Sequence, residues 1–264
     1  MREINEVFIN GVCLEEILDK HKRWVKKEEG GERAELINAD LSNVNLSDTN
    51  LTGADLTNAN LSGANLIWSI LKDCVLNYTY LRYANLSRTD LSYADLTNAD
   101  LSNTDLSFAC LICANLRCVD LKNAYLYSIN LKGANLYGAN LQYANLNNVK
   151  YSISTAFFAS QCPEEGSFIG YKKADNKIVK LLITEDAKRS SGTSRKCRCS
   201  KARVLSITNI ENVVKYNKVT SDYDKSFVYK VGEIVEVKDF DEDRWNECST
   251  GIHFFVNKEN ALNY

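Results

Sequence analysis

Residues 36–66 read LINADLSNVNLSDTNLTGADLTNANLSGANL, and this stretch sets the architecture of the chain. A leucine stands at every fifth position from Leu36 to Leu146, which makes 23 successive leucines without an exception. The residue two before each leucine is Ala in 14 of the 23 units, and the residue directly before it is Asp or Asn in 17. The repeated unit is therefore A-(D/N)-L-x-x.

A period of five residues fits neither regular element. In an α-helix five residues advance by about 500°, so successive leucines would move around the whole cylinder. In a strand, a step of five moves the side chain to the opposite face. A chain that turns a corner every five residues can bury all the leucines. The repeat therefore predicts a solenoid with Leu and the small residue inside and the Asp or Asn outside.

The repeated unit resembles that of the pentapeptide repeat family, and the resemblance covers residues 34–150. It implies a mainly β chain, with a right-handed quadrilateral β-helix of four units per coil and about six coils. Both ends of such a solenoid expose apolar side chains and unpaired backbone, so caps are expected.

The flanking segments predict a cap and a second domain. Residues 1–33 form the N-terminal cap, with an Asn-Gly hairpin at 7–12 and an apolar helical stripe at 14–25, in a helix that Gly30 and Gly31 terminate. His21 lies on that stripe and is interpreted as a packed histidine. Residues 151–167 are a connector, and residues 168–264 are a β-rich α+β domain.

This last domain has its own strand pattern and its own resemblance. Strands are predicted at 177–184, 202–208, 227–231, 233–237 and 251–256, and a short helix at 258–264. The segments RKCRCSKARVLSI (195–207), FVYKVGE (227–233) and RWNEC-x-x-GIHFF (244–255) resemble a domain that often follows pentapeptide repeats in phage and prophage-type proteins. This resemblance implies an architecture and no particular activity.

The composition excludes several classes of protein. The 32 basic and 34 acidic residues leave a net charge of −2, which gives no overall attraction to nucleic acid or to an anionic membrane. No apolar run is long enough for a membrane helix, and the N-terminus does not resemble a signal peptide. Nine cysteines in such a chain predict reduced thiols and a cytoplasmic location. Their spacing does not predict a closed metal site, so neither metal nor cofactor is expected.

Exposed aromatic residues on the solenoid are the first candidate site. If four units make one coil, residues twenty apart stack, and the Arg88 guanidinium would lie between Trp68 and Phe108. Tyr78, Tyr80 and Tyr127 add further aromatic surface. Clustered surface aromatics favour docking of the C-terminal domain, of a second copy, or of a foreign protein.

A basic segment is the second candidate. Residues 188–203 hold seven basic residues and no acid, and Ser190–Ser194 suggest a mobile loop. Arg195, Lys196 and Arg198 would then bind phosphates, nucleic acid or an acidic partner. The alternative is a solvated loop balanced by the acids of 239–243.

A third cluster contains Arg244, Trp245, Glu247, Cys248 and His253. Cys248 and His253 could form a nucleophile and its base, which would make the last domain a small enzyme. The alternative is a domain core in which Trp245 and His253 find hydrogen-bonding partners.

These observations favour a non-enzymatic protein-binding scaffold. The sequence does not identify the partner or the oligomeric state. One alternative is a DNA-mimic modulator of DNA gyrase, which the resemblance brings in because some pentapeptide repeat proteins act in this way. It is disfavoured because residues 34–150 carry ten acids against seven basic residues, and Asp90, Asp95, Asp100 and Asp105 surround one coil rather than line one face. The other alternative is enzyme activity around His253.

Overall fold

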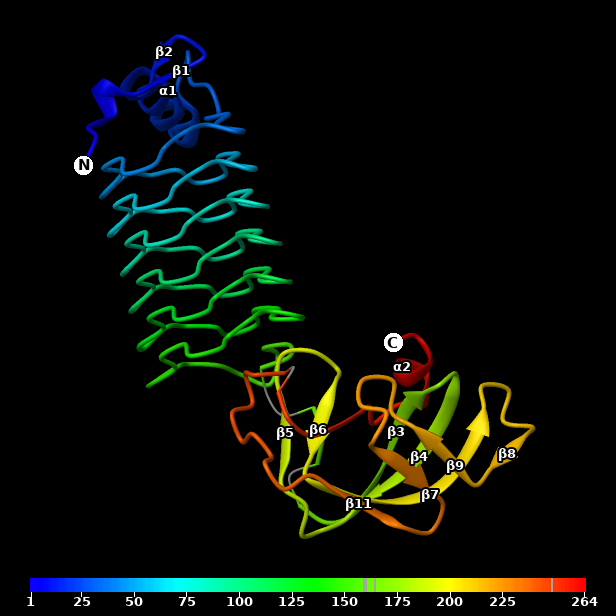
Figure 1. The fold of residues 1–264 in the computed structure, drawn as a ribbon. Coiled ribbons are helices and arrows are strands. Elements are labelled where there is room, and N and C mark those ends of the chain that lie inside the picture. Colours follow the sequence, from blue (N-terminus) through cyan, green and yellow to red (C-terminus); the bar gives the residue numbers. More distant parts are fainter. Residues whose placement is uncertain (159–160, 164, 248) are drawn as a thin grey trace. The chain divides into compact units, whose positions relative to one another are not determined.

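The computed structural model describes residues 1–158, 161–163, 165–247 and 249–264. The chain forms two compact units, Met1–Ala156 and Phe157–Tyr264, which are described separately below (Figure 1). Among the described residues, no helix is both long and apolar enough to cross a membrane. The prediction of a mainly β chain is confirmed, since the only α-helices among the described residues are α1 (Leu14–Lys26) and α2 (Lys258–Leu262).

The first unit begins with a small cap. It contains the 3-10 turn η1 (Ile4–Glu6), the hairpin of β1 (Phe8–Ile9) and β2 (Val12–Cys13), and the helix α1 (Leu14–Lys26). Asn10 and Gly11 form the hairpin turn with positive φ angles of 50° and 84°, as a type I′ turn requires. The predicted end of the helix at the glycine pair is wrong. Lys27 already takes the left-handed conformation, and its N–H donates to the carbonyls of Arg23 and Trp24.

His21 of α1 is fully buried, in agreement with its interpretation as a packed histidine. Its Nδ1 accepts a hydrogen bond from the backbone N–H of Ala34 at 3.0 Å. The ring stacks on Trp24, with 5.4 Å between the ring centroids. Burial lowers the pKa of His21, so the neutral ring is the stable form in this position.

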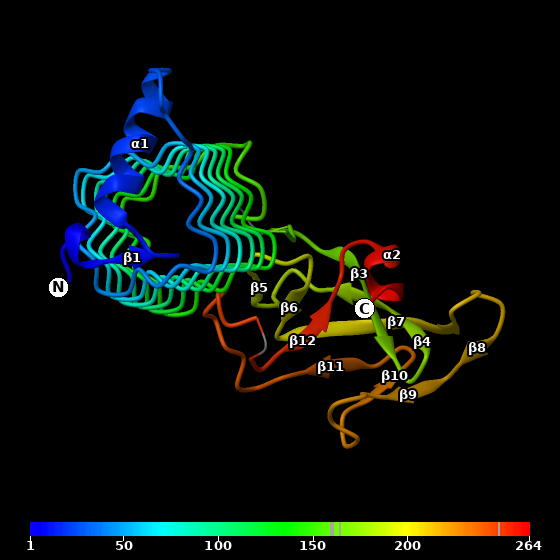
Figure 2. The same cartoon turned by 90° about the horizontal axis from the view of Figure 1, so that it is seen from above.

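The repeats join positions that are twenty residues apart. Parallel β-bridges run from Glu35↔Asp55 to Asn130↔Lys150 at this spacing, so four units bring the chain back to the same side (Figures 1 and 2). The N–H of Leu36, for example, donates to the carbonyl of Asp55 at 2.7 Å. Every repeat leucine from 36 to 141 is at most 2% exposed. The interior is therefore a column of leucines, as the five-residue period predicts.

Each corner of the repeat is a tight turn. The N–H of Ala39 donates to the carbonyl of Leu36 at 3.2 Å, and Asn38 between them has a φ of 58°. Most of the Asp and Asn residues before the leucines are only partly exposed, and their Oδ1 accepts from the backbone two residues on, as Asp55 does from Thr57 at 2.9 Å. Asn65 also donates from Nδ2 to Asn45 Oδ1 of the preceding coil at 3.1 Å. The polar residue of the unit thus stabilises both the corner and the stacking.

The second unit contains three antiparallel sheets. One sheet has the order β11-β7-β4-β3 with β8 paired to β7, the second has the order β12-β6-β5, and the third is the pair β10-β9. Tyr171 and Phe255 form an antiparallel bridge. Side chains such as Val179, Leu181 and Phe254 form the buried core. The elements are β3 (Phe168–Ala174), β4 (Lys177–Ile183), β5 (Arg189–Ser191), β6 (Cys197–Cys199), β7 (Lys201–Asn209), β8 (Lys215–Tyr216), β9 (Lys218–Thr220), β10 (Val228–Lys230), β11 (Ile234–Glu236), β12 (Ile252–Phe254) and α2 (Lys258–Leu262).

The strands predicted in this unit are present as β4, β7, β10, β11 and β12, and the predicted short helix is α2. The prediction of a mobile basic loop is wrong. Residues 189–191 and 197–199 pair as β5 and β6, and β7 begins at Lys201, so most of the segment belongs to sheets. Strands β3, β8 and β9 were also not predicted.

Candidate functional site

The repeat surface carries a continuous ladder of side chains. The guanidinium carbon of Arg88 lies 4.9 Å from the ring centroid of Trp68 and 4.8 Å from that of Phe108. The ring of Phe108 meets Tyr127 edge-on at 5.4 Å. Trp68 and Phe108 are still 55% and 49% exposed. We call these four residues, Trp68, Arg88, Phe108 and Tyr127, the aromatic ladder.

Three members of the aromatic ladder occupy a costly backbone position. Trp68, Arg88 and Phe108 have φ angles of 60°, 60° and 63°. Most non-glycine residues avoid this left-handed region, and Asn, Asp and Gly accept it most readily. Asp48 stands at the same corner of the column. The large side chains are therefore not what the turn itself prefers, and cation–π contacts offset only part of their cost.

The other predicted aromatic candidates lie elsewhere. Tyr78 is ten residues from both Trp68 and Arg88, which is half of the twenty-residue repeat, so it lies on the opposite side of the solenoid. Tyr80 begins the next repeat unit and bridges to Asn60 and Asp100, and both tyrosine rings are exposed. The structure thus joins Tyr127 to the ladder and separates Tyr78 and Tyr80 from it.

Replacing Tyr83 by Asn tests the cost of an aromatic side chain at such a corner. Tyr83 has a φ of 59°, is 71% exposed and makes no ring contact with any described residue. Tyr83→Asn is expected to raise the free energy of unfolding by up to about 1 kcal/mol, because Asn accepts the left-handed conformation more readily. Urea unfolding measures the change. The reverse variant Asn98→Tyr, at a corner with the same φ of 59°, should lose a similar amount.

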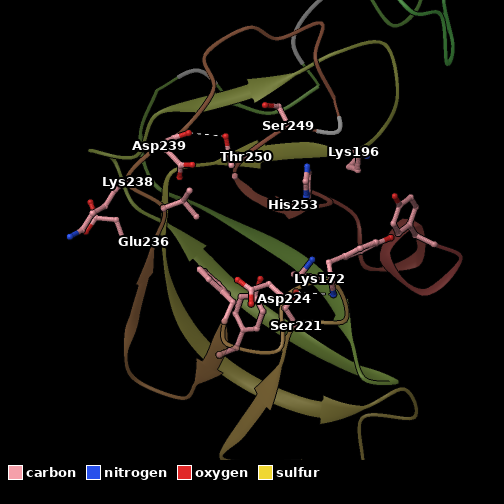
Figure 3. Close-up of a pocket in the computed structure, with 16 residues that line it drawn as sticks. Lys172, Lys196, Ser221, Asp224, Glu236, Lys238, Asp239, Ser249, Thr250 and His253 are labelled. Carbon is pink, nitrogen blue, oxygen red and sulfur yellow. Dashed lines mark hydrogen bonds between the residues drawn. The ribbon is translucent and has the colours of Figure 1, made fainter.

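A pocket of about 650 Å³ lies in the second unit (Figure 3). Its polar lining includes Lys172 of β3, Lys196 from the segment before β6, and His253 of β12. A neighbouring hollow of about 330 Å³ shares these three residues with it. Aromatic rings line the same pocket, namely those of Tyr223, Phe227, Tyr229 and Tyr264.

Lys172 is an unusual residue in this pocket. It is only 9% exposed, because it takes an inward position of β3 between the buried residues Gly170 and Ala174. Its ammonium group makes no hydrogen bond or ion pair with any described residue. Burial lowers the pKa of Lys172, the charge of Asp222 partly offsets this, and Lys196 lowers it further. Sequence reasoning missed Lys172 because β3 was not predicted, although a lysine within an alternating strand was the available signal.

His253 is neutral at pH 7. Its Nε2 lies 3.2 Å from the carbonyl oxygen of Glu247, which can only accept, so Nε2 carries the proton. Burial, and then the positive charges of Lys196, Lys172 and Arg198, lower the pKa of His253 to about 4. The ring is thus a neutral part of the pocket wall.

This shift predicts a pH dependence of stability. The unfolded chain binds a proton at His253 below about pH 6.5, and the folded chain only near pH 4, so stability falls as the pH drops through this window. Allowing for solvent at this half-buried ring, we expect a loss of about 2 kcal/mol. Hydrogen exchange of β12 peptides at several pH values measures it. In His253→Gln the loss of β12 protection at low pH should vanish. The pH dependence that His21 gives to the stability of the first unit should persist.

The basic candidates divide into three environments. Arg195 is exposed and donates to Asn260 Oδ1 at 3.2 Å, whereas the Lys196 ammonium lies 5.6 Å from the ring centroid of Tyr264. The prediction of Arg198 as a partner contact is wrong, because it is only 2% exposed. Its guanidinium donates to the carbonyls of Asp241, Thr250 and Asp243 at 3.0, 2.9 and 2.7 Å.

The third predicted cluster does not converge on one site. Arg244 donates to the carbonyls of Ser191 and Phe158, and Trp245 contacts the Phe158 ring at 5.6 Å. The Glu247 carboxylate accepts from the N–H of Ser194 at 2.8 Å, and Glu247 is not part of the pocket lining. Cys248 lies outside the described residues. Among the described members of this cluster, only His253 lines the pocket, and the pairing of His253 with Cys248 stays a prediction.

The described residues contain no group of three or more His, Cys, Asp or Glu side chains that could hold a metal ion. Cys197 and Cys199 of β6 are fully buried, and burial raises the pKa of the Cys199 thiol to about 12. Such a thiol stays protonated and unreactive at neutral pH.

Comparisons with known proteins agree with the division of the chain. The profile of pentapeptide repeats (8 copies) matches residues 34–73, 69–107 and 114–150. The profile of a family of unknown function, DUF5758, matches residues 158–261. No curated protein matches the chain in sequence. A phage or prophage origin and a cytoplasmic location stay predictions.

Solved structures of other pentapeptide repeat proteins are similar to part of the chain. HetL from the cyanobacterium Nostoc sp. strain PCC 7120, which is involved in heterocyst differentiation regulation, is 32% identical over 45% of this chain, with a TM-score of 0.28. The match covers 58% of HetL, which is less than two thirds of its length. Rfr23 from the cyanobacterium Cyanothece 51142 is 30% identical over 52% of this chain and 95% of its own, with a TM-score of 0.23. QnrB1, a plasmid-mediated fluoroquinolone resistance protein, is 18% identical over 44% of this chain and 81% of its own, with a TM-score of 0.21.

Proposed function

We propose that this protein, in which pentapeptide repeats are followed by a DUF5758 domain, is a non-enzymatic protein-binding scaffold. The repeats offer a rigid lateral surface, and the C-terminal domain adds a separate recognition surface. We further infer a right-handed quadrilateral β-helix of about six coils, a proposal that the twenty-residue bridges support. A preformed surface of this kind binds with little loss of conformational entropy.

The aromatic ladder is the observation that carries this proposal. Trp, Tyr and Arg are the residues that most often dominate the binding energy of protein interfaces. Here they are exposed, and Trp68 and Arg88 stand at corners where the backbone favours Asn or Gly. Tyrosines stand at left-handed corners elsewhere on the repeats, so what distinguishes the ladder is that Arg88 stacks between the exposed rings of Trp68 and Phe108. The ladder is therefore better explained by binding than by the stability of the turn.

The ladder also indicates the chemistry of the partner. Arg88 makes no ion pair with any residue in the described part of the chain, so its guanidinium can donate to a carboxylate from outside. The rings of Trp68 and Phe108 on either side offer apolar area. We infer a protein partner that presents apolar side chains around an acidic residue.

Affinity capture with matched variants tests this function. The ladder variant replaces Trp68, Arg88 and Phe108 by Asn, and the control variant replaces Tyr78, Tyr83 and Tyr93 by Asn at other left-handed corners. A partner captured from lysate of the encoding organism should bind the control as well as the natural chain. Its affinity for the ladder variant should fall by about 100-fold or more. Equal binding by both variants would contradict the proposal.

Neither alternative gains support from the structure. The repeat carboxylates that a DNA mimic would display are partly occupied, since Asp90 and Asp95 accept from the corner residues that follow them and Asp100 also pairs with Arg82. The enzyme alternative requires Cys248 beside His253, and Cys248 lies outside the described residues. If DNA gyrase were recovered equally well with the natural chain and with the ladder variant, the DNA-mimic alternative would be favoured instead.

A further inference from the structure

The pocket of the second unit is lined by charged side chains of both signs, namely Lys172, Lys196 and Lys238 and the carboxylates of Asp224, Glu236 and Asp239 (Figure 3). Lys172 and His253 lie toward one side of it, and Glu236 and Asp239 lie on the other side in this view. Lys196 lies with Lys172 and His253 in the wall that the pocket shares with the neighbouring hollow. The volume of about 650 Å³ lies within the range of small-molecule binding sites.

Lys172 has no counter-charge within ion-pairing distance among the residues that the structure describes. Lys172 is nine-tenths buried, and its ammonium makes no hydrogen bond or ion pair with a described residue. Burying an unpaired charge is expensive. His253 cannot supply a negative charge, and Asp222 acts on Lys172 only over a longer distance. A ligand anion at this position would offset the free-energy cost of burying the Lys172 ammonium without a counter-charge.

The rest of the lining selects against two kinds of anion. The exposed rings of Tyr223 and Tyr264 and the half-buried ring of Phe227 offer apolar faces, which a bare inorganic ion would not use. The carboxylates of Glu236 and Asp239, which the neighbouring Lys238 offsets only in part, would repel a long polyanion such as a nucleoside triphosphate or a nucleic acid strand. They can accept hydrogen bonds from hydroxyl or amino groups of a ligand.

We propose that this pocket binds a small aromatic phosphate monoester of the nucleoside monophosphate class. Its phosphate lies against Lys172 and Lys196, and its ring lies against Tyr223, Phe227 or Tyr264. The Glu236 and Asp239 side accepts from the sugar hydroxyls or the amino groups of the base. This binding is independent of the scaffold function, because it involves none of the repeat surface.

Isothermal titration calorimetry with the full chain tests the proposal. The probes are AMP, GMP, CMP and UMP, with adenosine, inorganic phosphate and ATP as comparisons. At least one nucleoside monophosphate should bind at least about tenfold more tightly than each comparison compound. Inorganic phosphate that binds equally well would overturn the role of the rings, and adenosine that binds equally well would overturn the role of the lysines. If no monophosphate binds at millimolar concentration, the proposal is wrong.

Two lysine variants show whether the binding is at this pocket. Lys172→Met removes the buried charge and fits an inward strand position, so the variant is expected to fold and to be at least as stable as the natural chain without ligand. Its affinity for the monophosphate should fall at least about tenfold. Lys180→Met, on the adjacent strand β4 but outside both hollows, should bind normally. Unchanged binding by Lys172→Met would contradict the assignment.

Discussion

Replacing Leu101 by Ala is expected to lower the free energy of unfolding of the repeat unit by about 3–5 kcal/mol. Leu101 is fully buried in the column of leucines. Its N–H donates to the carbonyl of Asp120 at 2.8 Å, which fixes the stacking of two coils around it. Because each leucine has its neighbours at fixed positions above and below, the column has little freedom to collapse into the cavity. The cost should therefore lie in the upper part of the usual range for a large-to-small change in a core.

Urea unfolding followed by hydrogen exchange and mass spectrometry can measure this effect for each unit separately. Peptides of residues 80–125 should lose protection in Leu101→Ala, and peptides of β4 and β7 should not. Ser87→Ala is a suitable control, because it removes only a hydroxyl bonded to Asn85 at a part-buried corner. A loss below about 1 kcal/mol for Leu101→Ala would show that the coils relax readily, against the close packing inferred here.

Arg198→Met is expected to destabilise the second unit by about 3–5 kcal/mol. The natural side chain is buried, and it holds three backbone carbonyls from the segment 241–250 while its guanidinium lies 5.4 Å from the ring centroid of Phe240. Met has a similar length but no donors. The carbonyls of Asp241, Asp243 and Thr250 would therefore be left without this partner, and the segment would lose its main attachment to β6.

Arg195→Met provides the matched comparison. Arg195 is the same residue type three positions earlier, but its side chain is exposed and donates to Asn260 Oδ1. Its loss should cost less than about 1 kcal/mol. Hydrogen exchange of peptides from β6 and from residues 239–250 should distinguish the two variants. Similar protection in both would show that the buried guanidinium contributes nothing specific.

The repeat unit was predictable because one strict period fixes both its core and its corners. Every leucine from Leu36 to Leu141 lies where the five-residue rule places it, and the spacing of twenty also placed Arg88 between Trp68 and Phe108. The period does not reveal the backbone conformation of the corner residues. Only the φ angles show that Trp68 occupies a conformation that usually belongs to Asn or Gly.

The second unit was less predictable because charge is a poor guide to burial in a short strand. Arg198 stands between Cys197 and Cys199 in a segment rich in basic residues, so the pattern suggested a solvated loop. The structure buries it instead, since three distant carbonyls accept from its guanidinium. Lys172 presents the same difficulty. Its burial depends on the pairing of β3 with β4, which local sequence does not encode.

The bridges between residues twenty apart also determine which changes in chain length the protein can accept during evolution. Gain or loss of five residues would keep every leucine inside, and the solenoid would still fold. Yet it would rotate all later corners by one side of the coil, so that Phe108 and Tyr127 would no longer follow Trp68 and Arg88. Insertions and deletions of twenty residues leave this alignment intact. Only insertions or deletions of twenty residues therefore preserve the surface pattern, although the leucine interior tolerates insertions or deletions of five residues.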